Sequence, residues 1–172
     1  MIHLSLLLFF ALCIVAYVDS IDLKDVQKII MDGKYIEASE ILNGYLQSYP
    51  DDFDVLQLIG TVNLKLENYN IAAEYLGRAV EITQWKYEII VANYIEALRL
   101  IDNINIDVIN NALQNHPNSV TVLFNIGVVY INANYINEAC DIFNKIITID
   151  SYKYDLWKRI IDISLELSLI HI

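Results

Sequence analysis

The sequence is poor in the residues that interrupt helices. Its 172 residues include only 2 Pro and 5 Gly, too few for the many turns of an all-β fold. A hydrophobic share of 56% also excludes a disordered chain, which has too little apolar surface to form a core. These scarcities predict a mostly helical chain. At 172 residues the chain is also long enough to bury one core of its own, so we expect a single domain.

Histidine and cysteine are scarce as well, which weakens any catalytic interpretation. The chain has three histidines and two cysteines, at His3, His116, His171, Cys13 and Cys140. The histidines are far apart in the sequence, so their spacing suggests no metal cluster and no nucleophile–histidine pair. No glycine-rich phosphate loop is present either. We therefore expect a protein that is not an enzyme and that needs no cofactor or metal.

Basic residues are outnumbered by acidic ones. The 11 Lys and Arg face 22 Asp and Glu, which gives a formal net charge of −11. Nucleic acids and anionic membranes attract clustered cations, and the cations here are scattered. This excludes nucleic acid as a partner and favours neutral or basic protein segments. The acidic cluster Asp51, Asp52 and Asp54 stands at an expected helix start, where carboxylates cap the free amide groups.

The amino-terminal stretch differs from the rest of the chain. From Ile2 to Val18 it holds no acidic or basic residue except His3. This pattern predicts that residues 1–20 are a signal peptide cleaved after Ser20, which would direct the chain to the endoplasmic reticulum lumen or out of the cell. As a helix the run would span roughly 26 Å, so the alternative is an uncleaved membrane anchor formed by residues 2–18.

An internal repeat is the main signal in the remaining sequence. Two sets of residues correspond at about twice a 34-residue period: Gly60, Tyr69, Ala72 and Ala79 with Gly127, Tyr135, Ala139 and Ile146. Small residues at these positions allow two helices to approach closely. Pro50 and Pro117 would end helices and set the turn into the next unit.

On these residues, together with Tyr130, the chain resembles the tetratricopeptide repeat family. The resemblance implies an all-α, right-handed superhelical solenoid of about four helical hairpins plus a C-terminal helix. Within a repeat domain at 21–172, the units are expected near 19–52, 53–86, 86–119 and 120–153, followed by a terminal helix at 154–168. The unit at 86–119 is degenerate, because Asn93 replaces the small first-helix residue and Asn105 stands where the second helix usually has Ala.

The resemblance also implies a function. Proteins of this family bind protein or peptide segments in a concave groove that the first helix of each hairpin lines. Mapping the repeat register residue by residue, with the third unit one residue short of the period, places seven residues in this groove: Gln57, Thr61, Tyr87, Ile90, Tyr94, Phe124 and Val128. The simpler alternative for Ile90 and Phe124 is packing between hairpins. A groove with an asparagine ladder would need a repeated Asn at one position, and only Asn125 fits.

Two further functions remain open at this point. The chain could be the amino-terminal repeat part of a larger glycosyltransferase or sulfotransferase. It could instead be a luminal chaperone-like module, similar to the co-chaperones in which a J-domain follows the repeats. The main expectation is a protein–protein interaction scaffold whose partner the sequence does not identify.

Overall fold

The computed structural model describes residues 22–153, 158 and 162, and all regular secondary structure within them is helical. The all-α prediction is therefore confirmed. The predicted signal at 1–20 lies outside the described residues, as does nearly all of the predicted terminal helix at 154–168.

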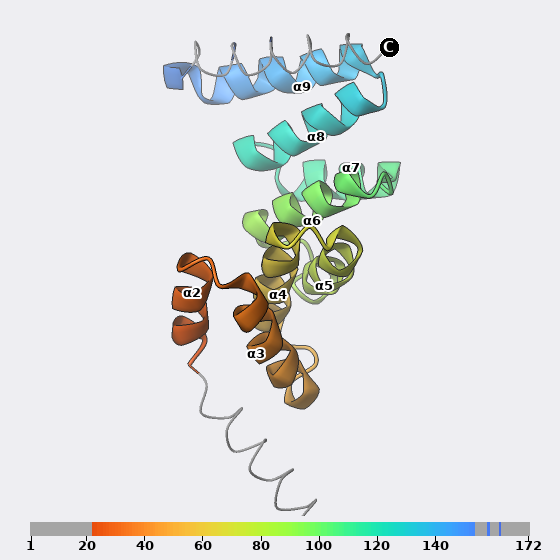
Figure 1. Ribbon diagram of the computed structural model, residues 1–172. Coiled ribbons are helices and arrows are strands. Elements are labelled where there is room, and N and C mark those ends of the chain that lie inside the picture. Colours follow the sequence, from red (N-terminus) through yellow and green to blue (C-terminus); the bar gives the residue numbers. More distant parts are fainter. Residues whose placement is uncertain (1–21, 154–157, 159–161, 163–172) are drawn as a thin grey trace, which may run out of the picture. The chain divides into compact units, whose positions relative to one another are not determined.

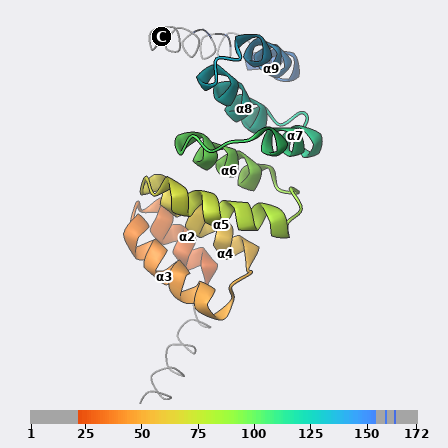
Figure 2. The ribbon, with the colours of Figure 1, turned by 90° about the vertical axis from the view of Figure 1, so that its right-hand side faces the viewer.

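The chain divides into two compact units, Met1–Ile82 and Thr83–Ile172. Within each unit, consecutive helices fold back on one another as hairpins (Figures 1 and 2). The helices of unit 1 are α2 Leu23–Met31, α3 Tyr35–Ser48, α4 Phe53–Lys65 and α5 Tyr69–Ile82. Those of unit 2 are α6 Glu88–Leu100, α7 Ile106–Asn115, α8 Val120–Asn132 and α9 Ile136–Ile149, followed by a short 3₁₀ helix at Ser151–Lys153.

The same turn closes the first helix of every hairpin. It contains one residue with a positive φ angle in each case: Gly33, Glu67, Asp102 and Asn134. The next amide donates to the carbonyl five residues earlier, as from Asn68 N to Asn63 O at 2.9 Å. This is the Schellman closure of a helix end. It forms even where the left-handed residue is not glycine, so the turn recurs without a conspicuous sequence signal.

Side chains and prolines fix where the helices begin and end. The Asp52 carboxylate caps α4 by accepting from the amides of Asp54 at 3.1 Å and Val55 at 3.3 Å. This confirms the capping role predicted for the acidic cluster. Tyr49 ends α3 with φ of −130°, because the following Pro50 disfavours a helical conformation before it. A matching pair, His116 and Pro117, follows α7.

Two hairpins depend on a glycine facing the second helix. Gly60 is the eighth residue of α4, and a Cβ atom added there would lie 2.5 Å from Leu76 Cγ, on the eighth residue of α5. At Gly127, the eighth residue of α8, the added atom would lie 2.5 Å from Phe143 Cε1 in α9. Both glycines therefore allow the close helix approach predicted for them. The fourth residue of three second helices is a fully buried alanine: Ala38, Ala72 and Ala139.

The third hairpin, α6–α7, departs from this arrangement. The eighth residue of α6 is Ile95, which is completely buried, and Asn93 is its sixth residue. The prediction that Asn93 replaces the small residue was therefore wrong. Helix α6 begins 35 residues after α4, one more than the assumed period. Its main helix contacts are with α8 instead of α7.

Helix α7 is also short, with 10 residues where α3, α5 and α9 have 14. Asn105 lies ten residues before the end of α7, as the buried alanines do in α3, α5 and α9, so it holds the predicted alanine position. It precedes the first residue of α7, however, and so lies outside the helix. Its side chain caps α7 by accepting from Val108 N at 3.0 Å. Asparagine favours such a cap over a helix interior, so the first turn of this second helix is missing.

A smaller correction concerns Tyr135. It was matched with Tyr69, the first residue of α5, but it is the N-cap residue that precedes α9. Ile136 is the first residue of α9 and takes the place of Tyr69. The turns before α5 and α9 have equal length, because each helix begins two residues after the residue with positive φ in its turn, Glu67 or Asn134. Tyr69 and Ile136 are therefore equivalent.

We predict that replacing Gly60 or Gly127 by Ala destabilises the protein. The new methyl group would collide with a buried side chain, and such overpacking costs about 1–3 kcal/mol. Gly44→Ala is the matched control, because nothing lies within 4 Å of the Cβ position there. This control should gain about 0.5–1 kcal/mol from helix propensity. Chemical denaturation measures all three variants, and equal stabilities would contradict the glycine contacts.

Candidate functional site

The seven predicted groove residues are divided between the two units. Gln57 and Thr61, the fifth and ninth residues of α4, belong to unit 1 and are half-buried. The Thr61 hydroxyl donates to the Gln57 carbonyl at 2.9 Å, which holds it against its own helix. The other five residues belong to unit 2, where their positions differ in part from the prediction.

In α8, Phe124 and Val128 hold the same fifth and ninth positions, and both are half-buried. The Phe124 ring lies 6.1 Å from the ring of Phe143, so it is held by the core of the α8–α9 hairpin. Phe124 thus combines a fixed position with a partly exposed apolar surface, and Val128 adds a second partly exposed apolar side chain one turn further along α8. This makes them the best supported members of the predicted set.

In α6 the predicted residues do not occupy these positions. Ile90 is the third residue and is 1% exposed, so the structure buries it, in agreement with the packing alternative. Tyr94 is the seventh residue, and its ring lies edge-on to Trp85 at 6.4 Å. Tyr87 precedes the helix as its N-cap residue. The reason is the spacing of the helices: Ile90 and Tyr94 lie 33 residues after Gln57 and Thr61, whereas α6 begins 35 residues after α4, so each stands two positions before the equivalent residue.

The fifth and ninth residues of α6 are instead Ala92 and Glu96. Helix α8 is fixed beside them, since Asn125 Nδ2 donates to the Ala92 carbonyl at 2.8 Å. Glu96 forms a two-point ion pair with Arg99, with donor–acceptor distances of 2.7 and 2.9 Å. We name Ala92, Glu96, Phe124 and Val128 the first-helix surface of unit 2. The sequence mapping missed Ala92 and Glu96 because it began the third unit at residue 86, whereas counting from the start of each helix finds them.

The asparagine ladder also needs correction. Asn93 and Asn125 are both the sixth residue of their helices, so Asn125 does not stand alone at its position. The Asn125 amide already donates to α6 within the protein. Its role in the described structure is to join two helices.

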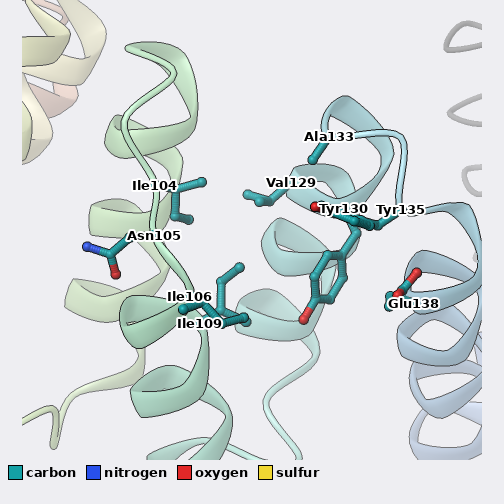
Figure 3. Close-up of a pocket in the computed structure, with 9 residues that line it drawn as sticks. All are labelled: Ile104, Asn105, Ile106, Ile109, Val129, Tyr130, Ala133, Tyr135 and Glu138. Atoms are coloured by element: carbon teal, nitrogen blue, oxygen red, sulfur yellow. The ribbon is translucent and has the colours of Figure 1, made fainter.

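A separate cavity of about 460 Å³ opens between the start of α7 and the turn from α8 to α9 (Figure 3). Two buried residues, Ile109 and Val129, contribute to its lining, together with the partly exposed Tyr130. Ile106 and Tyr135 are 58% and 57% exposed beside it. None of the seven predicted groove residues lines this cavity. Tyr130 was selected from the sequence only as a repeat-defining residue.

The phenol of Tyr130 is electrostatically perturbed. Burial raises its pKa above the ordinary value of 10.0, and the negative charge of Glu138 raises it further. Both causes act in the same direction because each disfavours the phenolate. The neutral phenol is therefore the stable form beside this cavity.

The sequence of two hairpins matches a known repeat. The model of the tetratricopeptide repeat matches residues 53–84 and 120–152. These segments are the α4–α5 and α8–α9 hairpins, in which a glycine faces the second helix. Two segments of this chain are thus similar to the tetratricopeptide repeat. The tetratricopeptide matches leave out residues 85–119, which hold the altered third hairpin.

Solved structures share the helical fold of this chain. A crystal structure of the MamA protein is similar with a TM-score of 0.67 and 17% identity, over 84% of this chain and 86% of that one. The structure of YrrB, described as a TPR protein with an unusual peptide-binding site, has a TM-score of 0.65 and 22% identity, over 73% and 66% of the two chains. No curated protein is significantly similar to the chain in sequence.

Within residues 22–153, 158 and 162, no group of three or more His, Cys, Asp or Glu side chains is arranged to hold a metal ion. No helix in that described part has the length and hydropathy needed to cross a membrane.

We predict that Tyr130 makes stability depend on alkaline pH. The folded protein holds the phenol proton more tightly than the unfolded chain does, so this contribution is complete below pH 10 and is lost as pH rises through the folded pKa. The difference in unfolding free energy between wild type and Tyr130→Phe should therefore shrink above pH 10. Denaturant titrations from pH 8 to 11 measure it.

Glu138→Gln is the companion variant, because it removes the second cause of the shift. It should move the loss of stability to lower pH without abolishing it. A wild-type protein that shows the same pH dependence as Tyr130→Phe would contradict this account.

Proposed function

We propose that this protein is a non-catalytic scaffold that binds a protein segment through the first-helix surface of unit 2. The observation that carries the proposal is the pair Phe124 and Val128. Both are apolar, partly exposed and held at equivalent turns of one tetratricopeptide helix. The tetratricopeptide fold supports an interaction role, as does the printed description of YrrB as a protein with a peptide-binding site.

The chemistry of this surface favours an apolar segment. Phe124 and Val128 offer area that a ligand side chain can cover, and full burial of such a side chain contributes about 1.5–3 kcal/mol. The charge of Glu96 is balanced by Arg99, so this pair need not attract a ligand charge. The net charge of −11 makes neutral or basic segments easier to accept than acidic ones.

The enzyme and chaperone alternatives have no specific support in the described residues. Location in the secretory pathway, or anchoring by residues 2–18, remains a proposal supported by the apolar run from Ile2 to Val18. Sequencing the amino terminus of the protein isolated from its source cells tests it. A terminus at Ile21 would support cleavage after Ser20, whereas an intact leader would favour the anchor.

Val128→Lys tests the binding surface. A lysine there would place a charge against the apolar segment of the ligand, and we expect the dissociation constant to rise at least tenfold. The partner is first captured on immobilised full-length protein and identified, and its purified binding segment is then titrated by calorimetry.

Asn144→Lys is the matched control, because it adds the same charge at an exposed position of α9. It should leave the dissociation constant within a factor of two. Equal affinities for wild type and Val128→Lys would reject the first-helix surface as the binding site. A captured substrate that the protein converts chemically would reject the scaffold proposal itself.

A further inference from the structure

The cavity beside α7 lies where the corresponding part of unit 1 has two apolar side chains packed against its core. In unit 1, Tyr35 begins α3 and Leu66 follows α4, and both pack against one core cluster. In unit 2 the matching first turn of α7 is not formed, and Ala133 stands where Leu66 does. The loss of a helical turn and the exchange of Leu for Ala together leave a hollow.

The lining of this hollow is apolar with one charge at its edge. Figure 3 shows Ile104, Ile106 and Ile109 on one side facing Val129 on the other. The Asn105 side chain is turned away toward its own helix, where it serves as the cap. Apolar side chains therefore form most of the opening, and an apolar ligand placed there would contact few polar groups of the protein.

Glu138 is the one ionisable carboxylate among the lining residues. It is exposed and takes part in none of the ion pairs formed by the described residues. Burial raises the pKa of Tyr130, and the negative charge of Glu138 raises it further. The Glu138 carboxylate therefore interacts electrostatically with another residue that lines the hollow. An unpaired acidic group beside an apolar hollow complements a ligand that carries a cation next to an apolar group.

The size of the hollow indicates what could enter it. A volume of about 460 Å³ lies within the usual range for ligand pockets, roughly 300–1,000 Å³. It would accept one large side chain with part of its neighbour. The exposed Ile106 and Tyr135 extend the apolar surface beyond the opening, which suits a longer chain more than an isolated small molecule.

We propose that this cavity, the α7–α9 pocket, docks a protein segment in which a large apolar residue is followed directly by Lys or Arg. The apolar side chain enters between Ile109 and Val129, and the cation pairs with Glu138. The pocket is separate from the first-helix surface of unit 2, since Phe124 and Val128 do not line it. The scaffold would thus hold two segments, or two parts of one partner.

The experiment uses short synthetic peptides as probes. Full-length ¹⁵N-labelled protein is titrated with acetyl-Gly-Ser-Phe-Lys-Gly-Ser-amide, and with versions in which Glu replaces Lys or Ala replaces Phe. Amide chemical shifts report weak binding directly. We expect saturable shifts confined to the start of α7, the end of α8 and the start of α9. The dissociation constant should be at least fivefold higher for each altered peptide.

Two variants test the pocket chemistry. Ala133→Leu restores the residue that unit 1 has at this position and should reduce binding at least tenfold. It replaces an exposed residue, so the thermal transition should remain at or above that of wild type. Glu138→Lys should reverse the preference, so that the Glu-containing peptide binds better than the Lys-containing one.

The results separate this proposal from the proposed function. Val128→Lys should keep the peptide shifts at the pocket, whereas Ala133→Leu should keep the affinity at the first-helix surface. Equal binding by wild type and Ala133→Leu would overturn the pocket proposal, and so would an absence of saturable shifts at millimolar peptide. Phenethylamine serves as a small-molecule probe. If it binds as tightly as the Phe-Lys peptide, the occupant is a small apolar cation and the proposed protein segment is wrong.

Discussion

The close approach of two antiparallel helices is the constraint on which this structure depends. Where the eighth residue of the first helix is glycine, the eighth residue of the second can pack directly against its backbone, as Leu76 does at Gly60 and Phe143 at Gly127. Dense packing of this kind tolerates no added methyl group. The two hairpins built this way are also the two that match the tetratricopeptide repeat.

The loss of that glycine in the third hairpin changes the chemistry of unit 2. Ile95 takes the place of glycine in α6, and Asn105 takes the place of alanine and caps a shortened α7. A bulky residue and a capping residue both oppose a tight hairpin. Helix α6 then packs mainly on α8, and the missing turn of α7 leaves an apolar pocket. The altered third hairpin therefore leaves a cavity at a place where unit 1 has apolar side chains packed on its core.

Unit 2 consequently offers two kinds of surface. The first-helix surface is shallow, with half-buried apolar side chains beside a closed ion pair. The α7–α9 pocket is deeper and has a carboxylate without a cationic partner among the described residues. A scaffold with both would distinguish partners by apolar shape on one surface and by an adjacent cation on the other. Such recognition requires no catalytic group.

The sequence by itself determined the helical class, the Asp52 cap of α4 and the two glycine contacts, because these depend on local residue chemistry and on a period that survives in good repeats. It placed Phe124 and Val128 correctly in the repeat register, but it misplaced Tyr94 and the small position of α6. Only the tertiary structure decided those positions, because α6 begins 35 residues after α4 and not 33 as the sequence match assumed, and two residues correspond to a rotation of about 200° on a helix. The pocket could not be predicted either, because it arises from a helical turn that does not form and from packing between segments far apart in the chain.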